Sequence, residues 1–296
     1  IGYGLNHLSW THRFGQRQTV ALVQGNIPQS AKWQPGQTDH ILSVYWQLSR
    51  PYLHNTLIFW PENATPVFQQ QAPQFYQELN QKLIQNKTSL LTGLPIYHSQ
   101  TRQYFNGAKV FGIGHGTYLK HQLVPFGEYV PFANFFGKAL QFLHIPMSNF
   151  TPGPAIPTPI EMNGHIVDVF ICYEIAFSRD VRRIVSHIDP SFIAVLSDDG
   201  WFGDSLGPFQ QQQISQMQAL STGKYIVTST NNGITNIIDE KGNIVKSVPP
   251  FQTAVLVGKI KLMRGETPWV QYGFWPIGLI LLLFVLLGLN GLRQRT

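Results

Sequence analysis

The stretch Val167-Asp168-Val169-Phe170-Ile171-Cys172-Tyr173-Glu174 decides how the rest of this sequence is interpreted. Its apolar run is typical of a buried strand, and the polar residues that follow mark the end of that strand. Cys172 is the only cysteine among 296 residues, so an intrachain disulfide is impossible. A cysteine at a strand end, with the carboxylate of Glu174 two residues later, indicates a nucleophile rather than a small packing residue. A helix starting near residues 177–180 would favour its thiolate form.

The chain on both sides of this stretch alternates short β-rich runs with amphipathic stretches. Strands are predicted over residues 19–24, 56–60, 89–94, 108–111, 165–171, 192–197, 225–229 and 234–238. Helices are predicted over 38–53, 73–85, 179–187 and 208–222. This alternation predicts a layered α/β or α+β domain. Residues 239–242 are predicted to form a hairpin turn, 112–116 a turn and 148–159 a loop.

Three further segments place isolated charges next to apolar strands. Glu62 follows Trp60-Pro61, where the proline stops a strand. Lys120 and Glu128 are single charges in a loop shaped by Pro and Gly, and Trp201 follows the strand that ends near residue 197. A solvated glutamate would explain Glu62 alone, and a local ion pair would explain Lys120 and Glu128. Because ligand sites of layered α/β folds gather at strand ends, we expect one shared cleft instead.

The composition indicates a membrane surface as the partner. The formal net charge is +6, with 43% hydrophobic residues and only 12% charged residues, against roughly 25% charged in average soluble domains. Lys and Arg are scattered rather than clustered, which favours anionic lipid over nucleic acid. The ten His residues lack the spacing of metal ligands, and no phosphate-binding glycine loop follows a strand. We expect no metal ion and no cofactor.

The C-terminal region predicts a membrane anchor. Residues 272–292 carry no charge and are long enough to cross a bilayer, which takes about 20 apolar residues. Tyr272 and Trp275 would lie at one interface, and the tail 293–296, with Arg293 and Arg295, would be cytoplasmic. The large domain would then lie on the outer side. Since the chain starts at Ile1, residues 1–17 are expected to lead in from preceding membrane helices.

The order Glu62, Lys120, Cys172 resembles the nitrilase superfamily of carbon-nitrogen hydrolases, and finer motifs resemble the bacterial apolipoprotein N-acyltransferase family. These motifs are Val23-Gln24-Gly25-Asn26-Ile27-Pro28-Gln29 with Lys32-Trp33, Trp60-Pro61-Glu62, Leu123-Val124-Pro125-Phe126-Gly127-Glu128-Tyr129-Val130-Pro131, Cys172-Tyr173-Glu174, Trp201-Phe202-Gly203-Asp204 and Thr230-Asn231-Asn232-Gly233. The resemblance implies a four-layer αββα sandwich over residues 18–265, followed by a transmembrane helix.

The resemblance also implies roles for the site residues. Glu62 would be the general base, Lys120 the cation at the tetrahedral intermediate, and Cys172 the acyl-carrying nucleophile. The residues implied to support catalysis or bind substrate are Trp33, Glu128, Tyr173, Glu174 and Trp201. The reaction would move an acyl chain from a phospholipid, through a thioester, to the N-terminal amine of a diacylglyceryl-cysteine apolipoprotein. The enzyme is expected to be a monomer in the bacterial inner membrane, with its catalytic domain on the periplasmic face.

Some positions depart from the family pattern. Asp198 stands where an Asn is common, and it adds a carboxylate near the site. Polar replacements of the family's usual Arg and Glu also occur at Gln216, Gln218, Ser221 and Lys224, and they predict a weaker supporting network. Two alternatives therefore stay open. One is a nitrilase-type amidase acting on a small substrate, and the other is a lipid- or lipoprotein-binding relative with little turnover.

The segment 132–147 repeats large apolar residues at helical spacing, among them Phe132, Phe136, Leu140 and Leu143. A helix packed on the core is the ordinary explanation for such a face. Because the segment directly follows the loop that carries Lys120 and Glu128, we predict an amphipathic lid that dips into the membrane and gates the cleft.

Overall fold

A computed structural model describes residues 8–34, 36–54, 56–129 and 149–293, with side chains described as far as Leu287. The predicted segment 132–147 lies outside these residues. The strands are β1 His12–Gln24, β2 Leu57–Trp60, β3 Ser89–His98, β4 Gln103–Gly112, β5 Gly114–His115, β6 Thr117–Leu119, β7 Ile160–Met162, β8 His165–Ile171, β9 Phe192–Ser197, β10 Ile226–Thr230, β11 Thr235–Ile238, β12 Ile244–Val248 and β13 Ala254–Arg264.

The helices alternate with these strands along most of the chain. The α-helices are α2 Gln29–Lys32, α3 Thr38–Ser49, α4 Pro73–Gln85, α6 Ser178–Ile188, α7 Gly207–Thr222, α8 Pro268–Tyr272 and α9 Trp275–Arg293. Short 3₁₀ turns cover Arg50–Tyr52, Gln69–Gln71, Cys172–Ala176 and Asp199–Phe202.

Two sheets pack face to face at the centre of the fold. One has the strand order β13-β1-β2-β3-β4-β6 and the other β12-β11-β10-β9-β8-β7-β5. Their strands are apolar on both faces because each sheet is covered on both sides. In β9, for example, Phe192 and Leu196 belong to the cluster between the sheets, whereas Ile193 and Val195 belong to the cluster under the helices. The alternation of a strand thus fills two cores at once.

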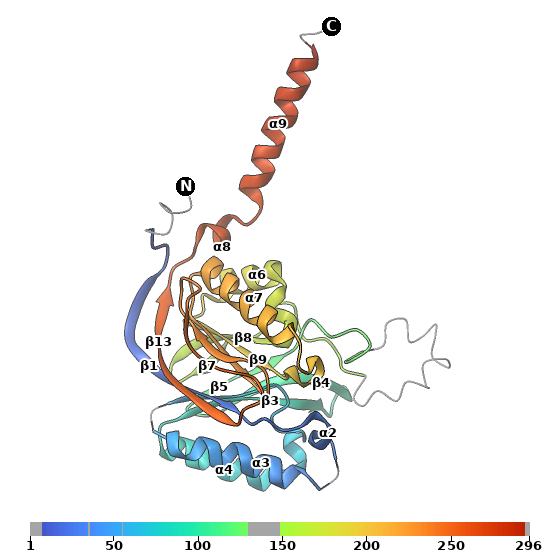
Figure 1. Cartoon of the computed structure of the whole chain (residues 1–296), viewed down its shortest axis with the longest axis vertical. Helices are drawn as coiled ribbons and strands as arrows, with labels where there is room; N and C mark the ends of the chain where they lie inside the picture. Colours follow the sequence, from blue (N-terminus) through green and yellow to red (C-terminus); the bar gives the residue numbers. More distant parts are fainter. Residues whose placement is uncertain (1–7, 35, 55, 130–148, 294–296) are drawn as a thin grey trace, which may run out of the picture.

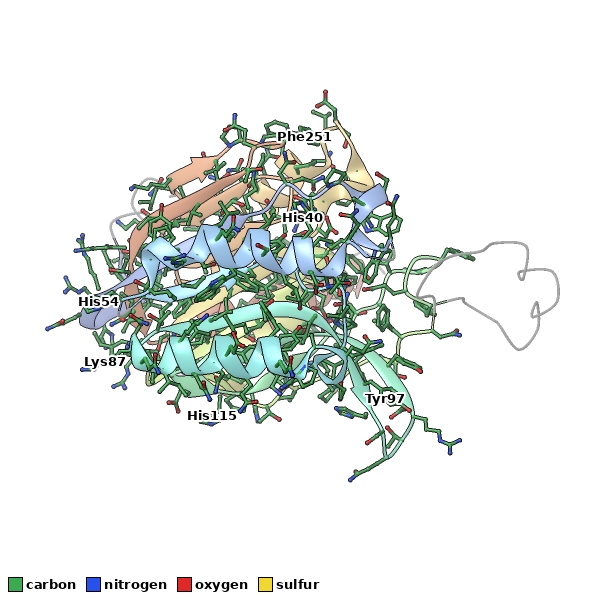
Figure 2. All side chains as sticks on the ribbon, turned by 90° about the horizontal axis from the view of Figure 1, so that it is seen from below. His40, His54, Lys87, Tyr97, His115 and Phe251 are labelled. Carbon is green, nitrogen blue, oxygen red and sulfur yellow. The ribbon has the colours of Figure 1, made fainter. Side chains whose placement is uncertain are left out.

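Helices cover the outer face of each sheet and complete four layers. Helices α3 and α4 lie side by side below the six-stranded sheet (Figures 1 and 2), where Ile41, Tyr45 and Leu79 join the cluster under them. Helices α6 and α7 cover the seven-stranded sheet (Figure 1), where Val181 and Ala219 are buried. The expected αββα sandwich is confirmed.

The strands and helices predicted from the sequence are all present, with small differences at their ends. The strands that the sequence did not predict are mainly at sheet edges or contain both polar and apolar residues. Strand β13 alternates apolar residues with Lys259 and Lys261, and its antiparallel pairing with β1 extends that strand back to His12. Part of the segment 1–17, expected to lead in from a membrane, therefore lies in the sheet.

The glycine cluster 112–116 is more than the turn that we predicted. Gly114 and His115 form the short strand β5, which pairs antiparallel with β7. A Cβ atom at Gly114 would collide with the carbonyl oxygen of Glu161, so glycine allows the two backbones to approach each other. The chain does reverse here, since β4 and β6 pair antiparallel, but β5 was missed because this close approach leaves no hydrophobic pattern in the sequence.

Helix α9 extends away from the sandwich (Figure 1). Its large apolar side chains between Ile277 and Leu287 are 50–67% exposed. Within the residues described here, no helix combines the length and the apolar character needed to cross a membrane.

Gly93 on β3 is required for the position of Glu62. A Cβ atom added at Gly93 would lie 2.6 Å from both the Cα of Glu62 and the carbonyl oxygen of Pro61. Backbone atoms cannot move aside cheaply, so Gly93→Ala should lower the free energy of unfolding by roughly 1–3 kcal/mol. Urea unfolding measures this loss. Gly278→Ala is the control, since no atom lies within 4 Å of its added Cβ, and equal stability of the two variants would contradict the prediction.

Candidate active site

A cavity of about 250 Å³ opens at one end of the two sheets. Six of the residues singled out in the sequence line it, namely Trp33, Glu62, Lys120, Glu128, Cys172 and Trp201. The remaining lining residues are Gln29, Asn63, Val124, Gly127, Phe150, Asp198 and Phe202. The shared cleft expected from the strand ends is therefore present.

The cavity forms because both sheets end at the same place. Glu62 follows β2, and Lys120 follows β6, both in the six-stranded sheet. Cys172 follows β8 in the seven-stranded sheet. Strand β2 runs parallel to β1 in one sheet, and β8 runs parallel to β9 in the other. Their ends deliver a carboxylate and a thiol from facing layers. Residues 110 positions apart in the chain come together only through the packing of the sheets.

Lys120 is the central charge of the site. Its side chain is 1% exposed, and its Nζ lies 3.2 Å from Oε1 of Glu62 and 2.9 Å from Oε1 of Glu128. Burial alone would lower the pKa of Lys120, but the carboxylates of Glu62 and Glu128 outweigh burial and raise it. The ammonium group therefore stays charged at every physiological pH.

Both carboxylate oxygens of Glu62 are held. Asn106 Nδ2 donates to Oε1 at 2.7 Å, and the backbone N–H of Asp198 donates to Oε2 at 3.1 Å. Burial raises the pKa of Glu62, and the Lys120 ammonium opposes that rise. A carboxylate with a raised pKa is a stronger base than a solvated one, so Glu62 is suited to accept a proton inside the cavity.

Cys172 has an unusual backbone and a protonated thiol. Its φ of +56° lies in the left-handed region, which is uncommon for non-glycine residues. Burial, followed by the charge of Glu62, raises the pKa of the thiol to about 12. Burial outweighs the positive charge of Lys120 and opposes the thiolate form that a helix near residues 177–180 was expected to favour.

Glu174 and Tyr173 lie behind the cavity rather than in its wall. Glu174 accepts hydrogen bonds from the Tyr118 hydroxyl and from the backbone N–H groups of His121, Gln122 and Ile171, at 2.8–2.9 Å. Its carboxylate thereby ties the Lys120 loop to the Cys172 turn. Tyr173 donates to the Leu123 carbonyl oxygen at 2.7 Å, and its ring centroid lies 5.6 Å from Lys120 Nζ.

Sequence reasoning assigned no role to Lys32, Asn106 or Asn231. Lys32 is buried, donates to the Glu62 carbonyl oxygen at 3.1 Å and pairs with Asp198. Asn231 Nδ2 donates to the other oxygen of Asp198 at 3.1 Å. The extra carboxylate of Asp198 is thus matched by a buried cation. Lys32 and Asn231 belong to two of the family motifs, Lys32-Trp33 and Thr230-Asn231-Asn232-Gly233. Asn106 lies within β4, and no sequence motif marks it as a site residue.

The polar substitutions near α7 do not leave the region without contacts. Gln218 Nε2 donates to the Ile175 carbonyl oxygen at 3.0 Å and to the Ser178 hydroxyl at 2.8 Å. Lys224 Nζ pairs with Asp189 at 2.8 Å. The expected weakening of the supporting network does not appear as missing hydrogen bonds of Gln218 and Lys224, because these side chains reach backbone carbonyls and nearby polar groups.

The arrangement is suited to nucleophilic acyl transfer. A thiol, a carboxylate with raised pKa and a permanent cation line one small, largely apolar cavity. Among the described side chains, no group of three or more His, Cys, Asp or Glu is placed to hold a metal ion.

The chain belongs to the carbon-nitrogen hydrolase family, whose sequence profile matches residues 19–267. Solved structures share the fold at low identity. The amidase of Nesterenkonia, from the nitrilase superfamily, superposes with a TM-score of 0.62 at 15% identity, over 87% of this chain and 94% of its own. The carbon-nitrogen hydrolase of Helicobacter pylori gives a TM-score of 0.61 at 13% identity, over 82% of this chain and 89% of its own.

Curated relatives are more similar in sequence. The apolipoprotein N-acyltransferase of Coxiella burnetii is 41% identical over 287 residues, which cover 97% of this chain and 59% of that protein. The apolipoprotein N-acyltransferase of Pseudomonas aeruginosa is 40% identical over 293 residues, which cover 97% of this chain and 57% of that protein. The chain therefore spans somewhat more than half the length of these relatives.

The pair Lys32–Asp198 provides a test of the network around Glu62. Both side chains are 5% exposed or less, so Lys32→Met leaves an unpaired buried carboxylate. This substitution should lower the free energy of unfolding by roughly 3–5 kcal/mol. Adding Asp198→Asn should recover most of that loss, as measured by urea unfolding. Lys261→Met is the control, because its partly exposed pair with Glu240 should be worth less than about 1 kcal/mol. Failure of the second substitution to restore stability would contradict this pairing.

Proposed function

We propose that this chain is the catalytic part of an apolipoprotein N-acyltransferase. The observation that carries the proposal is that Glu62, Lys120 and Cys172 converge on one cavity in a chain 41% identical to a relative of that name. The acyl donor is a phospholipid, and the acceptor is the α-amine of a diacylglyceryl-cysteine lipoprotein. Acyl transfer to an amine needs a nucleophile, a base and a cation for the oxyanion, and the cavity holds all three.

The first half-reaction moves the acyl chain to the enzyme. The carboxylate of Glu62 takes the proton from the Cys172 thiol as the sulfur attacks the ester carbonyl carbon. Lys120 stabilises the oxyanion, a type of interaction worth about 10²–10³ in rate. The tetrahedral intermediate then expels the lysophospholipid alkoxide, which takes the proton from Glu62. A thioester remains on Cys172.

The second half-reaction delivers the chain to the amine. The lipoprotein amine attacks the thioester carbonyl, again with Lys120 beside the oxyanion and Glu62 as the proton acceptor. Cleavage of the carbon–sulfur bond releases an amide, and the sulfur recovers its proton from Glu62. Donor and acceptor use the same cavity in turn, which predicts ping-pong kinetics.

The cavity mouth fits a long apolar substrate. Trp33, Phe150, Trp201 and Phe202 contribute aromatic surface to its wall, and Trp201 is 70% exposed. Exposed aromatic groups next to a reactive thiol give an acyl chain apolar surface to lie against. Glu128 and Glu62 both pair with Lys120, and Glu174 holds the loop that carries it.

The proposal also places the protein at a bacterial inner membrane, as a monomer with the sandwich on the periplasmic face. The anchor would be residues 272–292, most of which lie in helix α9, and it is supported by the row of exposed apolar side chains of that helix. Arg293 and Arg295 would remain on the cytoplasmic side.

Cys172→Ala tests the covalent step. We expect intact-mass spectrometry after mixing with phospholipid to show one acyl adduct on the wild type and none on the variant. Addition of a diacylglyceryl lipopeptide should discharge the adduct and yield an N-acylated product. Transfer by Cys172→Ala at the wild-type rate would refute the mechanism. Hydrolysis of small amides without a phospholipid adduct would identify an amidase, and lipid binding without an adduct would identify a binding protein.

Glu62→Gln separates the base from its electrostatic effect. The charge of Glu62 raises the pKa of Cys172, so its removal should lower that pKa and speed alkylation by iodoacetamide at pH 8. Acyl transfer should nevertheless be lost, because the proton acceptor is gone. Wild-type alkylation should rise about tenfold per pH unit up to pH 11, below the thiol pKa. Slower alkylation of the variant at all pH values would show a resting thiolate that depends on Glu62.

Lys120→Ala should also abolish transfer, with a circular dichroism spectrum near that of the wild type.

A further inference from the structure

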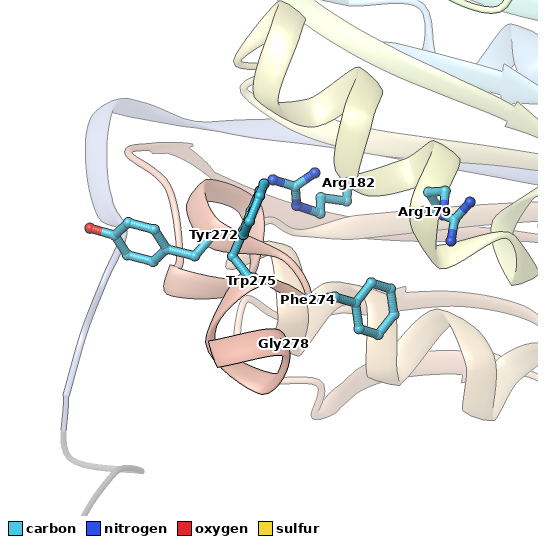
Figure 3. Close-up of a pocket in the computed structure, with 6 residues that line it drawn as sticks. All are labelled: Arg179, Arg182, Tyr272, Phe274, Trp275 and Gly278. Carbon is cyan, nitrogen blue, oxygen red and sulfur yellow. The ribbon is translucent and has the colours of Figure 1, made fainter. Parts of the chain in front are cut away.

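A second cavity lies where α9 leaves the sandwich. It measures about 390 Å³ and is lined by Arg179, Arg182, Tyr272, Phe274, Trp275 and Gly278. The two arginines lie on α6, and the aromatic residues lie on the junction of α8 and α9 (Figure 3). It shares no lining residue with the cavity around Cys172. Its arginines and aromatic rings therefore have no part in the proposed acyl transfer.

Arg182 is held in a fixed orientation. Its Nε donates to the Trp269 carbonyl oxygen at 2.9 Å, and its Nη2 donates to the Gln271 carbonyl oxygen at 3.1 Å. Gly273 ends α8 with φ of +54°, and a Cβ at this position would lie 2.6 Å from Arg182 Nε. Glycine thus lets the guanidinium lie directly against the backbone. Of its five N–H groups, three have no partner in the described part of the chain.

Arg179 carries a charge without a protein partner. Across the ranges that the structure describes, it makes no hydrogen bond and no ion pair. The nearest acidic residue in sequence, Asp180, is engaged elsewhere, since it accepts from Arg183 at 2.9 Å and from Gln122 at 2.8 Å. None of the residues lining the cavity is acidic. The cavity therefore presents two positive charges that nothing described neutralises.

The surroundings of these charges are those of a membrane interface. Tyr272, Phe274 and Trp275 are 55–76% exposed, and the exposed apolar row of α9 begins at Ile277. Tyr and Trp are enriched at the level of lipid headgroups, and arginine pairs with phosphate through parallel N–H donors. If α9 enters the bilayer as proposed above, the cavity lies at the depth of the headgroup phosphates.

We propose that this cavity binds the headgroup phosphate of an anionic phospholipid, separately from the acyl donor. The inference rests on the proposed membrane placement of α9. A zwitterionic headgroup would bring its own cation beside two arginines with no lining carboxylate to receive it, so the cavity selects an anionic lipid. Arg182 lies on α6 and bonds to the end of α8, so the bound lipid would fix the angle between the sandwich and the membrane.

The test measures lipid retention by the full chain carrying Cys172→Ala, a background in which no acyl-enzyme forms. Native mass spectrometry from detergent micelles counts bound lipids after addition of equimolar phosphatidylglycerol and phosphatidylcholine. We expect preferential retention of phosphatidylglycerol. Arg179→Gln should reduce that retention about fivefold, the effect of one basic residue near an anionic surface. Arg183→Gln is the matched control, because it removes the same charge from the same helix outside the cavity.

The outcomes separate this inference from the reaction. Equal retention of the two lipids, or equal loss in both variants, would overturn the cavity as a specific site. Displacement of phosphatidylglycerol by millimolar glycerol phosphate would assign it to a soluble anion instead. Retention of neither lipid would refute both this inference and the membrane placement of α9. Acylation of Cys172, measured in the unmodified chain, decides the proposed function independently of all three results.

Discussion

The buried ammonium group of Lys120 is the constraint on which the site depends. A charge that is almost fully removed from water is tolerated only where opposite charges surround it. Glu62 and Glu128 supply these charges from different segments, so the strand ends must meet at fixed distances. The cost of burying one cation thus favours a single arrangement of the ends of β2 and β6 at the catalytic end of the six-stranded sheet.

Nearby charges also control the reactivity of the thiol. Burial and the charges of Glu62 and Asp199 raise the pKa of Cys172, whereas the charge of Lys120 lowers it. A raised pKa disfavours the thiolate, which is the form through which oxidation and alkylation proceed. Reactivity develops only when a carbonyl group approaches and the proton has Glu62 to receive it.

The layers and most of the site could be predicted from the sequence because the apolar run of a strand and the reactive residue at its end are adjacent in the chain. An apolar run followed by Glu62, or by Cys172, marks a strand and a reactive group together. Asn106 gave no such signal, since it lies within β4 and reaches Glu62 only through sheet packing. Strand β13 was missed because Lys259 and Lys261 interrupt the apolar pattern. The pKa of Cys172 depends on burial, which a linear sequence does not reveal.

The carboxylate of Glu174 joins two backbones that carry different reactive groups. Because it binds the N–H groups of Ile171, His121 and Gln122, the loop of Lys120 and the turn of Cys172 move as one piece. Residues elsewhere in the cavity wall, such as Trp33 or Trp201, can therefore be substituted without changing the separation between the Lys120 ammonium group and the Cys172 sulfur.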